Sequence, residues 1–235
     1  MRERRVPVVY EDEMILVCEK PIGMPVQGDH SRDMDVETVL RHYLYEKQEG
    51  EEEPYLALVH RLDRPVGGLM VFAKTGEAAA DLSRQIREGS FEKCYQAVVC
   101  GSLPEEAGTF EDELLKDAKN NTTRVVKPGT KGARHAVLDY ELIDEIETGE
   151  GILSWVLIFL QTGRHHQIRV QFASRGLGLY GDTKYNPLFM KKKGYSQLGL
   201  YSTRLAFVHP GTKKTVTFKT DPKGEAFDLM DVEAY

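Results

Sequence analysis

The sequence predicts an α+β fold in which helices flank a mixed, largely antiparallel sheet. Three observations support this prediction: short apolar segments bounded by turn residues are frequent, only three segments predict helices, and few strand-helix-strand repeats of the kind that builds a parallel sheet are found. A chain of 235 residues can bury a substantial core, as one large domain or as two fused lobes. Because no Gly/Ser-rich linker marks a boundary, we expect one domain over residues 1–235.

The N-terminal part is predicted to alternate strands and helices. Residues 14–20 form an apolar run that ends before Pro21, which is typical of a short strand. Residues 36–48 carry apolar side chains at helical spacing, and so do residues 77–87. Three further apolar runs predict strands, at residues 56–59, 68–73 and 93–100.

The C-terminal part is rich in predicted strands. Residues 136–143 alternate between apolar and polar, whereas residues 152–160 are nearly all apolar, so we expect the second segment to be a central strand covered on both faces. A turn at Gly163 precedes a predicted helix at about residues 165–175. The last two strands form a hairpin around a His-Pro-Gly-Thr turn, at residues 198–208 and 215–218.

Composition narrows the class of protein. With 41% hydrophobic and 29% charged residues, the chain is typical of a folded globular protein. It has neither a signal peptide nor an apolar run of membrane-spanning length, so we expect a cytoplasmic protein with no membrane partner. Cys18, Cys94 and Cys100 lack the spacing of a disulfide framework or of a structural zinc site, and we expect three reduced thiols.

The net charge of the chain affects whether it can bind a nucleic acid. The net charge of −6 argues weakly against a polyanion, because phosphate contacts depend on Lys and Arg. Acidic residues are, however, concentrated at residues 49–53, at residues 139–150 and near the C-terminus. Binding of nucleic acid would therefore require a local basic face.

The densest polar cluster of the sequence lies at residues 60–68, between two predicted strands, where loops commonly present functional groups. Asp63 is flanked there by Arg61 and Arg64. Arginine neighbours favour the ionised form of an Asp and can hold an RNA phosphate, so this segment could supply a catalytic carboxylate and also bind its substrate. A surface turn with solvated ion pairs is the alternative interpretation.

A second polar segment, residues 161–170, follows the most apolar predicted strand. Arg164 lies there at the predicted start of a helix, where backbone N–H groups favour anions, and is placed to meet a carboxylate or a phosphate. His165 and His166 are adjacent, so on a helix they do not converge on one metal ion, and their spacing is not the His-Glu-x-x-His of zinc hydrolases. We therefore expect no metal site.

Taken together, the two segments resemble the RluA family of pseudouridine synthases, whose His-Arg-Leu-Asp-Arg pattern followed by Gly-Leu matches residues 60–64 and 68–69. The resemblance spans most of the chain in the family's order. Its further matches are Val71-Phe-Ala-Lys, Tyr95 in Lys-Cys-Tyr, Gly163-Arg-His-His-Gln-Ile-Arg, Gly181-Asp-Thr-Lys-Tyr and Arg204-Leu-Ala-Phe-Val-His-Pro. It implies the pseudouridine synthase fold and, because the match begins by about residue 8, a catalytic domain without an N-terminal RNA-binding module of the S4 type.

The resemblance implies that the protein isomerises uridine to pseudouridine in RNA with no cofactor, and that Asp63 is the essential catalytic residue. Asp63 would drive cleavage of the N1–C1′ glycosidic bond, the detached uracil would rotate, and C5 would rejoin the ribose. Addition of Asp63 to C1′ and removal of the ribose 2′ proton by Asp63 both stay open. Either route needs an ionised carboxylate in a fixed position, so the family's pairing partner, matched here by Arg164, would lower the pKa of Asp63 and fix its rotamer.

Three further residues match family positions that bind the substrate. A base reacts only after it leaves the RNA helix, at a cost of roughly a few kcal/mol, and the family places an arginine, here Arg61, in the vacated space. Tyr95 matches the tyrosine on which the freed base stacks while it turns. Leu205 matches the apolar residue on the other side of the base. An ordinary core tyrosine and an ordinary buried leucine are the alternatives for these two positions.

The chain departs from the family at His165, Gln171 and Gly67, where Thr, His and Ser are frequent. These changes bear on the fit of the substrate more than on the reaction. We expect the RNA partner to be a stem-loop of transfer RNA or of large-subunit ribosomal RNA, and the protein to be a monomer by default. The competing interpretations are a noncatalytic RNA-binding protein that retains the fold and a glycoside hydrolase, which normally needs a second carboxylate that is not evident here.

Overall fold

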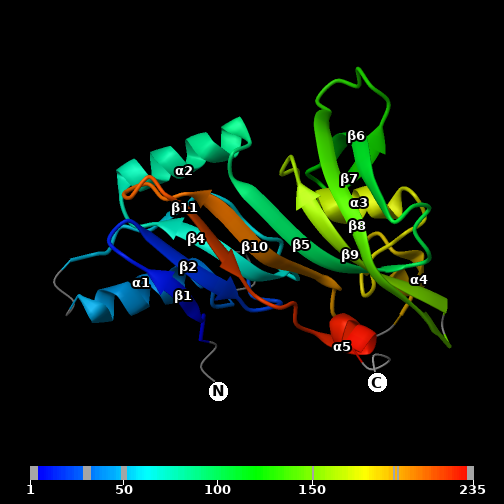
Figure 1. The fold of residues 1–235 in the computed structure, drawn as a ribbon, viewed down its shortest axis with the longest axis horizontal. Helices are drawn as coiled ribbons and strands as arrows, with labels where there is room; N and C mark the ends of the chain where they lie inside the picture. Colours follow the sequence, from blue (N-terminus) through cyan, green and yellow to red (C-terminus); the bar gives the residue numbers. More distant parts are fainter. Residues whose placement is uncertain are drawn as a thin grey trace. The chain divides into compact units, whose positions relative to one another are not determined.

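The structure is a computed structural model that describes residues 5–28, 33–48, 52–149, 151–192, 194 and 196–231 (Figure 1). The chain forms two compact units. Unit 1 comprises the residues up to Glu92 together with Ser202–Asp221, and unit 2 comprises Lys93–Tyr201 together with the residues from Pro222 onward. The expectation of one domain over residues 1–235 stays a prediction.

The sheet of unit 1 is built around two strands whose side chains are buried on both faces. β2 (Ile15–Lys20) pairs antiparallel with β4 (Gly67–Ala73), and Val17 lies opposite Val71. β10 (Leu200–Val208) lies beside β4 in the sheet, and its residues from Ser202 onward belong to unit 1. Three short antiparallel strands complete the sheet: β1 (Val8–Glu11) on β2, β3 (Ala57–Leu58) on β4 and β11 (Thr215–Lys219) on β10.

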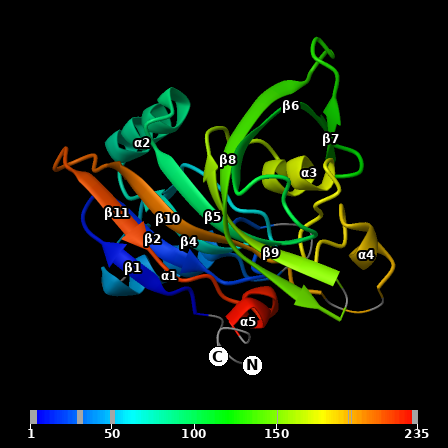
Figure 2. The same ribbon diagram turned by 45° about the vertical axis from the view of Figure 1, so that its right-hand side comes forward.

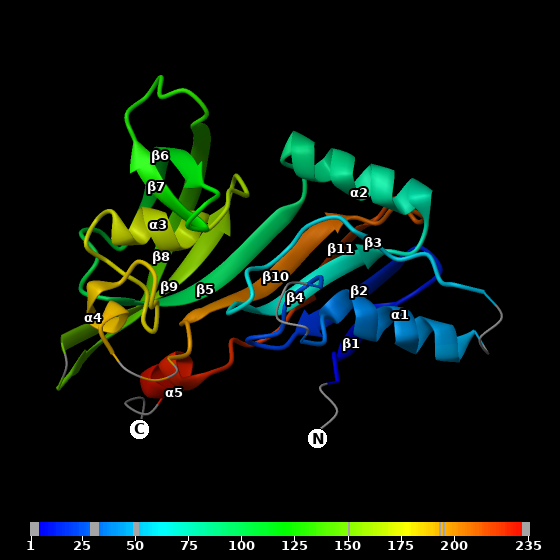
Figure 3. The same cartoon turned by 180° about the vertical axis from the view of Figure 1, so that it is seen from behind.

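Two helices cover the opposite faces of this sheet (Figures 1 and 3). α2 (Gly76–Glu88) begins where the Thr75 side chain accepts a hydrogen bond from an amide of the first turn. Its buried residues pack in a cluster with alternate side chains of β2, β4 and β10. α1 (Val36–Lys47) begins at Asp35 in the same way and buries Val36, Leu40 and Leu44. The alternation of side chains along these strands therefore directs one set of apolar residues to the α2 face of the sheet.

Unit 2 is a curved antiparallel sheet in the order β5, β9, β8, β6, β7. Figure 2 shows α3 (Gln167–Ala173) on the inner side of the curve formed by β6, β7 and β8. Two short helices follow along the chain, α4 (Pro187–Met190) and α5 (Glu225–Asp231). The strands are β5 (Glu92–Cys100), β6 (Ala107–Asp117), β7 (Thr122–Val126), β8 (Arg134–Thr148) and β9 (Gly151–Leu160).

The predicted fold class is confirmed, because the described chain is an α+β structure whose paired strands run largely antiparallel. Two details differ from expectation. β9 is central, between β5 and β8, but its burial alternates, so only one face is fully covered. The predicted helix at 165–175 begins only at Gln167, because His166 has a left-handed backbone (φ 53°). No helix in the described part of the chain has the length and apolar character needed to cross a membrane.

Candidate active site

The Asp63 segment is a short loop of unit 1 held by two buried apolar side chains. Leu62 and Val66 are buried, whereas Arg61 is exposed and Asp63 is half-buried. The Val66 amide donates to the Asp63 carbonyl oxygen at 3.0 Å, which closes a turn on the Asp63 backbone. The loop therefore presents its polar side chains outward from a fixed backbone.

A buried lysine lies beneath this loop. The Lys20 side chain has no exposed surface, and its Nζ donates to the carbonyl oxygens of Pro21 (2.9 Å), Met24 (2.7 Å) and Arg64 (3.0 Å). Burial lowers the pKa of Lys20 to about 7, and the nearby Asp63 carboxylate acts in the opposite direction. Lys20 thus ties the backbone next to Asp63 to the end of β2. Sequence reasoning missed it because a lysine is rarely buried.

The free energy of unfolding is expected to depend on Lys20 and on pH. Because the folded-state pKa is near 7 and the ordinary value is 10.5, the unfolded state holds one more proton between these values, so stability rises with pH across this window and is flat below it. Lys20→Met removes this linkage and leaves three carbonyls without their donor, and we expect a loss of about 3 kcal/mol or more.

Guanidinium unfolding at about pH 6.5, 8 and 9.5 measures this effect. The difference in stability between wild type and Lys20→Met should grow with pH, whereas the exposed control Lys214→Met should show none. A difference that stays constant over this range would mean that the three carbonyl groups keep Lys20 charged throughout.

Gly68 fixes the other end of the loop. Its φ of +112° lies in a region that favours glycine, and a Cβ atom there would lie 2.2 Å from the Ser202 carbonyl oxygen of β10. The Ser202 hydroxyl also donates to the Leu69 carbonyl at 3.1 Å. His60 closes the arrangement, since its Nε2 accepts from the Val71 amide at 3.1 Å. The loop thus enters and leaves the sheet at fixed points.

In unit 2, the Arg164 turn is braced by one buried amide side chain. The Gln167 oxygen accepts from the Thr162 hydroxyl (2.8 Å) and from the Arg164 amide (3.0 Å), and the Gln167 nitrogen donates to the Val137 carbonyl (3.1 Å). The Arg164 side chain is exposed, and its Nε donates to the His135 carbonyl at 2.8 Å. Arg164 is therefore anchored to β8 by one nitrogen of its guanidinium.

His166 is a buried histidine whose ring is neutral. Its Nδ1 lies 2.6 Å from the Tyr185 hydroxyl, which accepts a hydrogen bond from the Thr123 amide at 2.8 Å. Burial, helped by the positive charge of Arg169, lowers the pKa of His166 to about 2. The Tyr185 hydroxyl thus links the neutral His166 ring to the backbone of β7.

Tyr95 lies on β5 opposite Ile158 of β9 and is 6% exposed. Lys93 is two residues away on the same strand, so it shares a face of the sheet with Tyr95. Burial lowers the pKa of Lys93, and its Nζ lies close to Gly163, where a Cβ atom would be 3.3 Å from it. A basic group therefore adjoins both the Arg164 turn and the Tyr95 strand.

Residues 14–174 match the family model described as RNA pseudouridylate synthase. The chain belongs to this family. The match covers Arg61, Asp63, Tyr95 and Arg164, and Leu205 lies beyond it. The resemblance inferred from the two polar segments is therefore confirmed at the level of the family.

Relatives of known name support the same membership. The chain is 32% identical over 237 residues to ribosomal large subunit pseudouridine synthase D of Neisseria meningitidis serogroup B, which covers 96% of this chain and 60% of the relative. It is 32% identical over 211 residues to ribosomal large subunit pseudouridine synthase C of Salmonella typhi, covering 87% of this chain and 63% of the relative. The chain thus spans about 60% of the length of these pseudouridine synthases.

Solved structures agree on the fold of this pseudouridine synthase family member. Human RNA Pseudouridylate Synthase Domain Containing 1 superposes with a TM-score of 0.75 at 18% identity, covering 98% of this chain and 96% of that one. Human RNA Pseudouridylate Synthase Domain Containing 4 gives 0.71 at 23% identity, covering 92% and 88%. At these identities the likeness concerns the fold alone.

The site residues expected from the family resemblance fall in two groups. Unit 1 carries Arg61 and Asp63 on one loop and Leu205 on β10, while unit 2 carries Tyr95 and Arg164. Leu205 has no exposed surface and packs in the core cluster under α2. Among the described residues, no group of three or more His, Cys, Asp or Glu side chains is arranged to hold a metal ion. The catalytic and binding roles of the five residues stay predictions.

A buried ion pair holds the segment after the Arg164 turn, and its loss should be costly. Arg169 binds Asp182 with two hydrogen bonds of 2.8 and 2.7 Å, and the side chains are 7% and 0% exposed. Arg169→Met leaves a buried carboxylate without its cation, so we expect a loss of about 3–5 kcal/mol in urea unfolding. Arg175→Met breaks the more exposed pair with Asp112 and should cost less than about 1 kcal/mol. Equal losses would contradict this assignment.

Proposed function

We propose that the protein isomerises uridine to pseudouridine in a structured RNA. One observation carries the proposal: the chain's family match contains an Asp63 loop that is pinned on three sides, by Lys20, by the Gly68 contact with β10 and by buried apolar side chains. A half-exposed carboxylate on a fixed backbone is what positioned covalent or general-base chemistry requires.

In the proposed reaction, the N1–C1′ bond breaks and its electron pair leaves on N1 of uracil. Asp63 either forms a bond to C1′ or takes the ribose 2′ proton. The uracil then turns and C5 bonds to C1′, while the Asp63–C1′ bond breaks or, on the other route, Asp63 returns the proton to C2′. The C5 proton leaves, and N1 takes up a proton. Product and substrate are isomers, so the balance needs no cofactor.

The other site residues have proposed roles that follow from their chemistry. Arg164 pairs with the Asp63 carboxylate and keeps it ionised. Tyr95 stacks on the free base, because an aromatic ring binds the base in every orientation while it turns. Arg61 occupies the space that the base vacates. Leu205, which the resemblance puts on the other side of the base, is buried in the core cluster under α2 and would have to become exposed to contact the base. Base extrusion costs roughly a few kcal/mol, which these contacts offset.

We propose large-subunit ribosomal RNA as the substrate, since the named relatives of about 32% identity are ribosomal large subunit pseudouridine synthases. Transfer RNA is the other candidate. A stem-loop with an accessible uridine suits a protein that reads RNA by shape and by single-stranded bases. A monomer in the cytoplasm is the accompanying expectation.

Mass-spectrometric mapping of pseudouridine in host RNA, with and without the gene, tests this proposal. We expect one or a few sites to disappear on deletion and to return with the wild-type gene but not with Asp63→Asn. The RNA that holds those sites identifies the substrate. If deletion changes no site, or Asp63→Asn restores every site, the protein is a noncatalytic RNA-binding member of the family.

A further inference from the structure

A basic segment of unit 2 contrasts with the acidic chain that contains it. Residues 116–134, here called the basic arm, comprise the tip of the β6–β7 hairpin, β7 and the β7–β8 connection. This arm carries six basic residues and one acidic residue, Asp117, whereas the whole chain has a net charge of −6. All six basic side chains are exposed: Lys116, Lys119, Arg124, Lys127, Lys131 and Arg134. Figures 1 and 3 show the arm projecting from the rest of unit 2.

The basic residues of the arm also differ in their partners. Elsewhere, many basic side chains are neutralised by carboxylates, and these are Arg41, Lys47, Lys74, Arg84, Arg169, Arg175, Arg204 and Lys213. Within the described part of the chain, the six side chains of the arm make no ion pair with a carboxylate and no hydrogen bond. Their positive charge is therefore available to an anionic partner.

The arm is continuous with the Arg164 turn. Arg164 donates to the carbonyl of His135, the residue that follows Arg134 at the end of the arm. Lys116 and Lys184 lie close enough to His166 for their charges to act on its ring. A series of positive charges thus extends from the proposed catalytic arginine to the tip of the hairpin.

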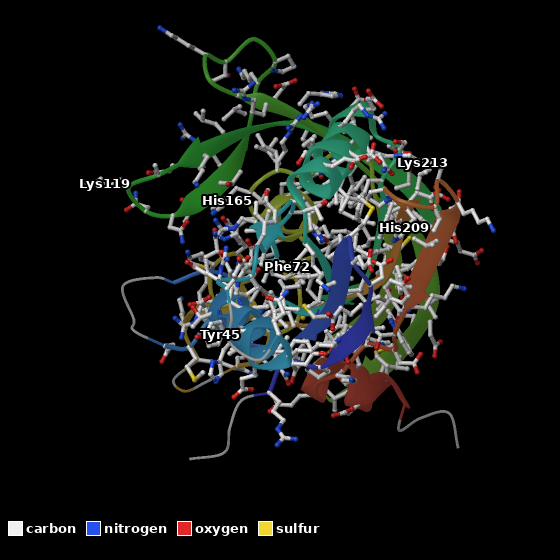
Figure 4. All side chains as sticks on the ribbon, turned by 90° about the vertical axis from the view of Figure 1, so that its left-hand side faces the viewer. Tyr45, Phe72, Lys119, His165, His209 and Lys213 are labelled. Carbon is white, nitrogen blue, oxygen red and sulfur yellow. The ribbon has the colours of Figure 1, made fainter. Side chains whose placement is uncertain are left out.

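His165 fastens the arm to that turn. Its Nδ1 lies 2.8 Å from the Thr123 hydroxyl and its Nε2 lies 3.0 Å from the Asn121 side-chain oxygen, so both ring nitrogens contact the hairpin. The His165 ring also stacks on His166 at 3.8 Å between centroids. Figure 4 shows Lys119 at the outer end of the hairpin and His165 on its inner side.

Many exposed acidic residues lie in a different part of the same sheet from the arm, whereas Glu111 and Glu113 lie beside His135 at the end of the arm. Six exposed carboxylates lie near the β5–β6 connection and in the C-terminal half of β8. They are Glu105, Glu106, Glu141, Asp144, Glu145 and Glu147. Because β8 begins in the arm at Arg134 and ends at Thr148, the two charges lie toward opposite ends of one strand. The far end of β8 therefore repels a polyanion, whereas the six basic side chains of the arm attract it.

We propose that the basic arm binds the phosphate backbone of the substrate RNA. We further propose that His165 fixes the position of the arm relative to Arg164, so that the RNA backbone is held at a set distance from the place where the base binds. This inference rests on the proposed function, since it takes the RNA substrate from there. Phosphate contacts carry no sequence information and contribute affinity that falls with salt. The arm therefore accounts for how an acidic protein binds RNA.

The test compares two triple variants of equal charge change. Lys119→Gln, Lys127→Gln and Lys131→Gln together remove three charges from the arm. Arg87→Gln, Lys214→Gln and Lys219→Gln together remove three exposed charges from unit 1. Binding of an in vitro transcribed large-subunit ribosomal RNA, in the Asp63→Asn background, is measured across a salt series, and pseudouridine formation is measured in the wild-type background.

We expect the arm variant to bind about tenfold or more weakly and its slope of log affinity against log salt to be shallower by roughly two. Its kcat/KM should fall through a higher KM. The unit 1 variant should match the parent protein in both. His165→Thr should weaken binding in the same direction and increase hydrogen exchange in residues 119–126.

An arm variant with parental affinity and slope overturns the inference, and so does an equal loss in the unit 1 variant. Neither result bears on the proposed function, because that depends on whether the wild-type protein forms pseudouridine. Conversely, if the wild type forms none but the arm variant still loses salt-dependent binding, the proposed reaction fails while the arm stands as an RNA-binding surface.

Discussion

Replacement of Asp63 by Asn should lower pseudouridine formation by at least about a thousandfold, because either proposed route needs a carboxylate that attacks or accepts a proton. Asn keeps the size of the side chain and removes the negative charge. The side chain is only half-buried and the loop is held by its backbone contacts, so the variant should fold like the wild type. Single-turnover conversion of large-subunit ribosomal RNA, followed by mass spectrometry, gives the rate.

The control for this substitution is Asp33→Asn. Asp33 is a nearby carboxylate of unit 1 that pairs with Arg64 and is 44% exposed. It takes no part in the proposed reaction, so the rate should stay within a few-fold of wild type. Retention of more than about a tenth of the wild-type rate by Asp63→Asn would remove Asp63 from the chemical step.

Gly68→Ala should strongly destabilise unit 1. The added Cβ atom would lie 2.2 Å from the Ser202 oxygen and 2.6 Å from its nitrogen, and both are backbone atoms that cannot swing aside. The residue also has a φ of +112°, which an L side chain rarely adopts. We expect a loss of about 4 kcal/mol or more, seen as a lower midpoint in thermal and guanidinium unfolding.

Gly89→Ala separates the two causes of this loss. Gly89 ends α2 with a φ of +76°, and a Cβ atom there would meet nothing within 4 Å. Its substitution should cost only the backbone strain, about 1 kcal/mol. If the two alanine variants are equally stable, the contact between Gly68 and β10 has no energetic role.

The sequence predicted those parts of the fold where side-chain pattern and turn residues agree. Residues 15–20 and 67–73 are apolar and bounded by Pro or Gly, and both are strands. β6 and β7 escaped prediction because many of their exposed side chains are charged and their buried ones are covered by residues distant in the sequence, among them Val170 of α3 and Tyr185. Periodicity within a segment does not reveal such a partner.

Some residues of the candidate site were predicted from the sequence and others were not. The Asp63 and Arg164 segments were evident because charged residues between apolar strands are unusual. Lys20 was not, since its burial depends on three carbonyl groups that converge only in the folded loop. Gln167 was also not predicted, because a glutamine that braces a turn cannot be told from a surface glutamine in the sequence alone.

Unit 1 is built from two segments that are far apart in the sequence, so its parts are synthesised at different times. Its strand β4 is made early, but the neighbouring strand β10 enters the unit only at Ser202, after the intervening residues Lys93–Tyr201. At about 5–20 residues per second, the ribosome needs roughly 5–20 s to produce that insertion. During this interval the edge of β4 has no β10 to pair with, and an open strand edge is a template for aggregation. Unit 2 has most of its chain before unit 1 can close, so the order of translation and the order of folding differ for this protein.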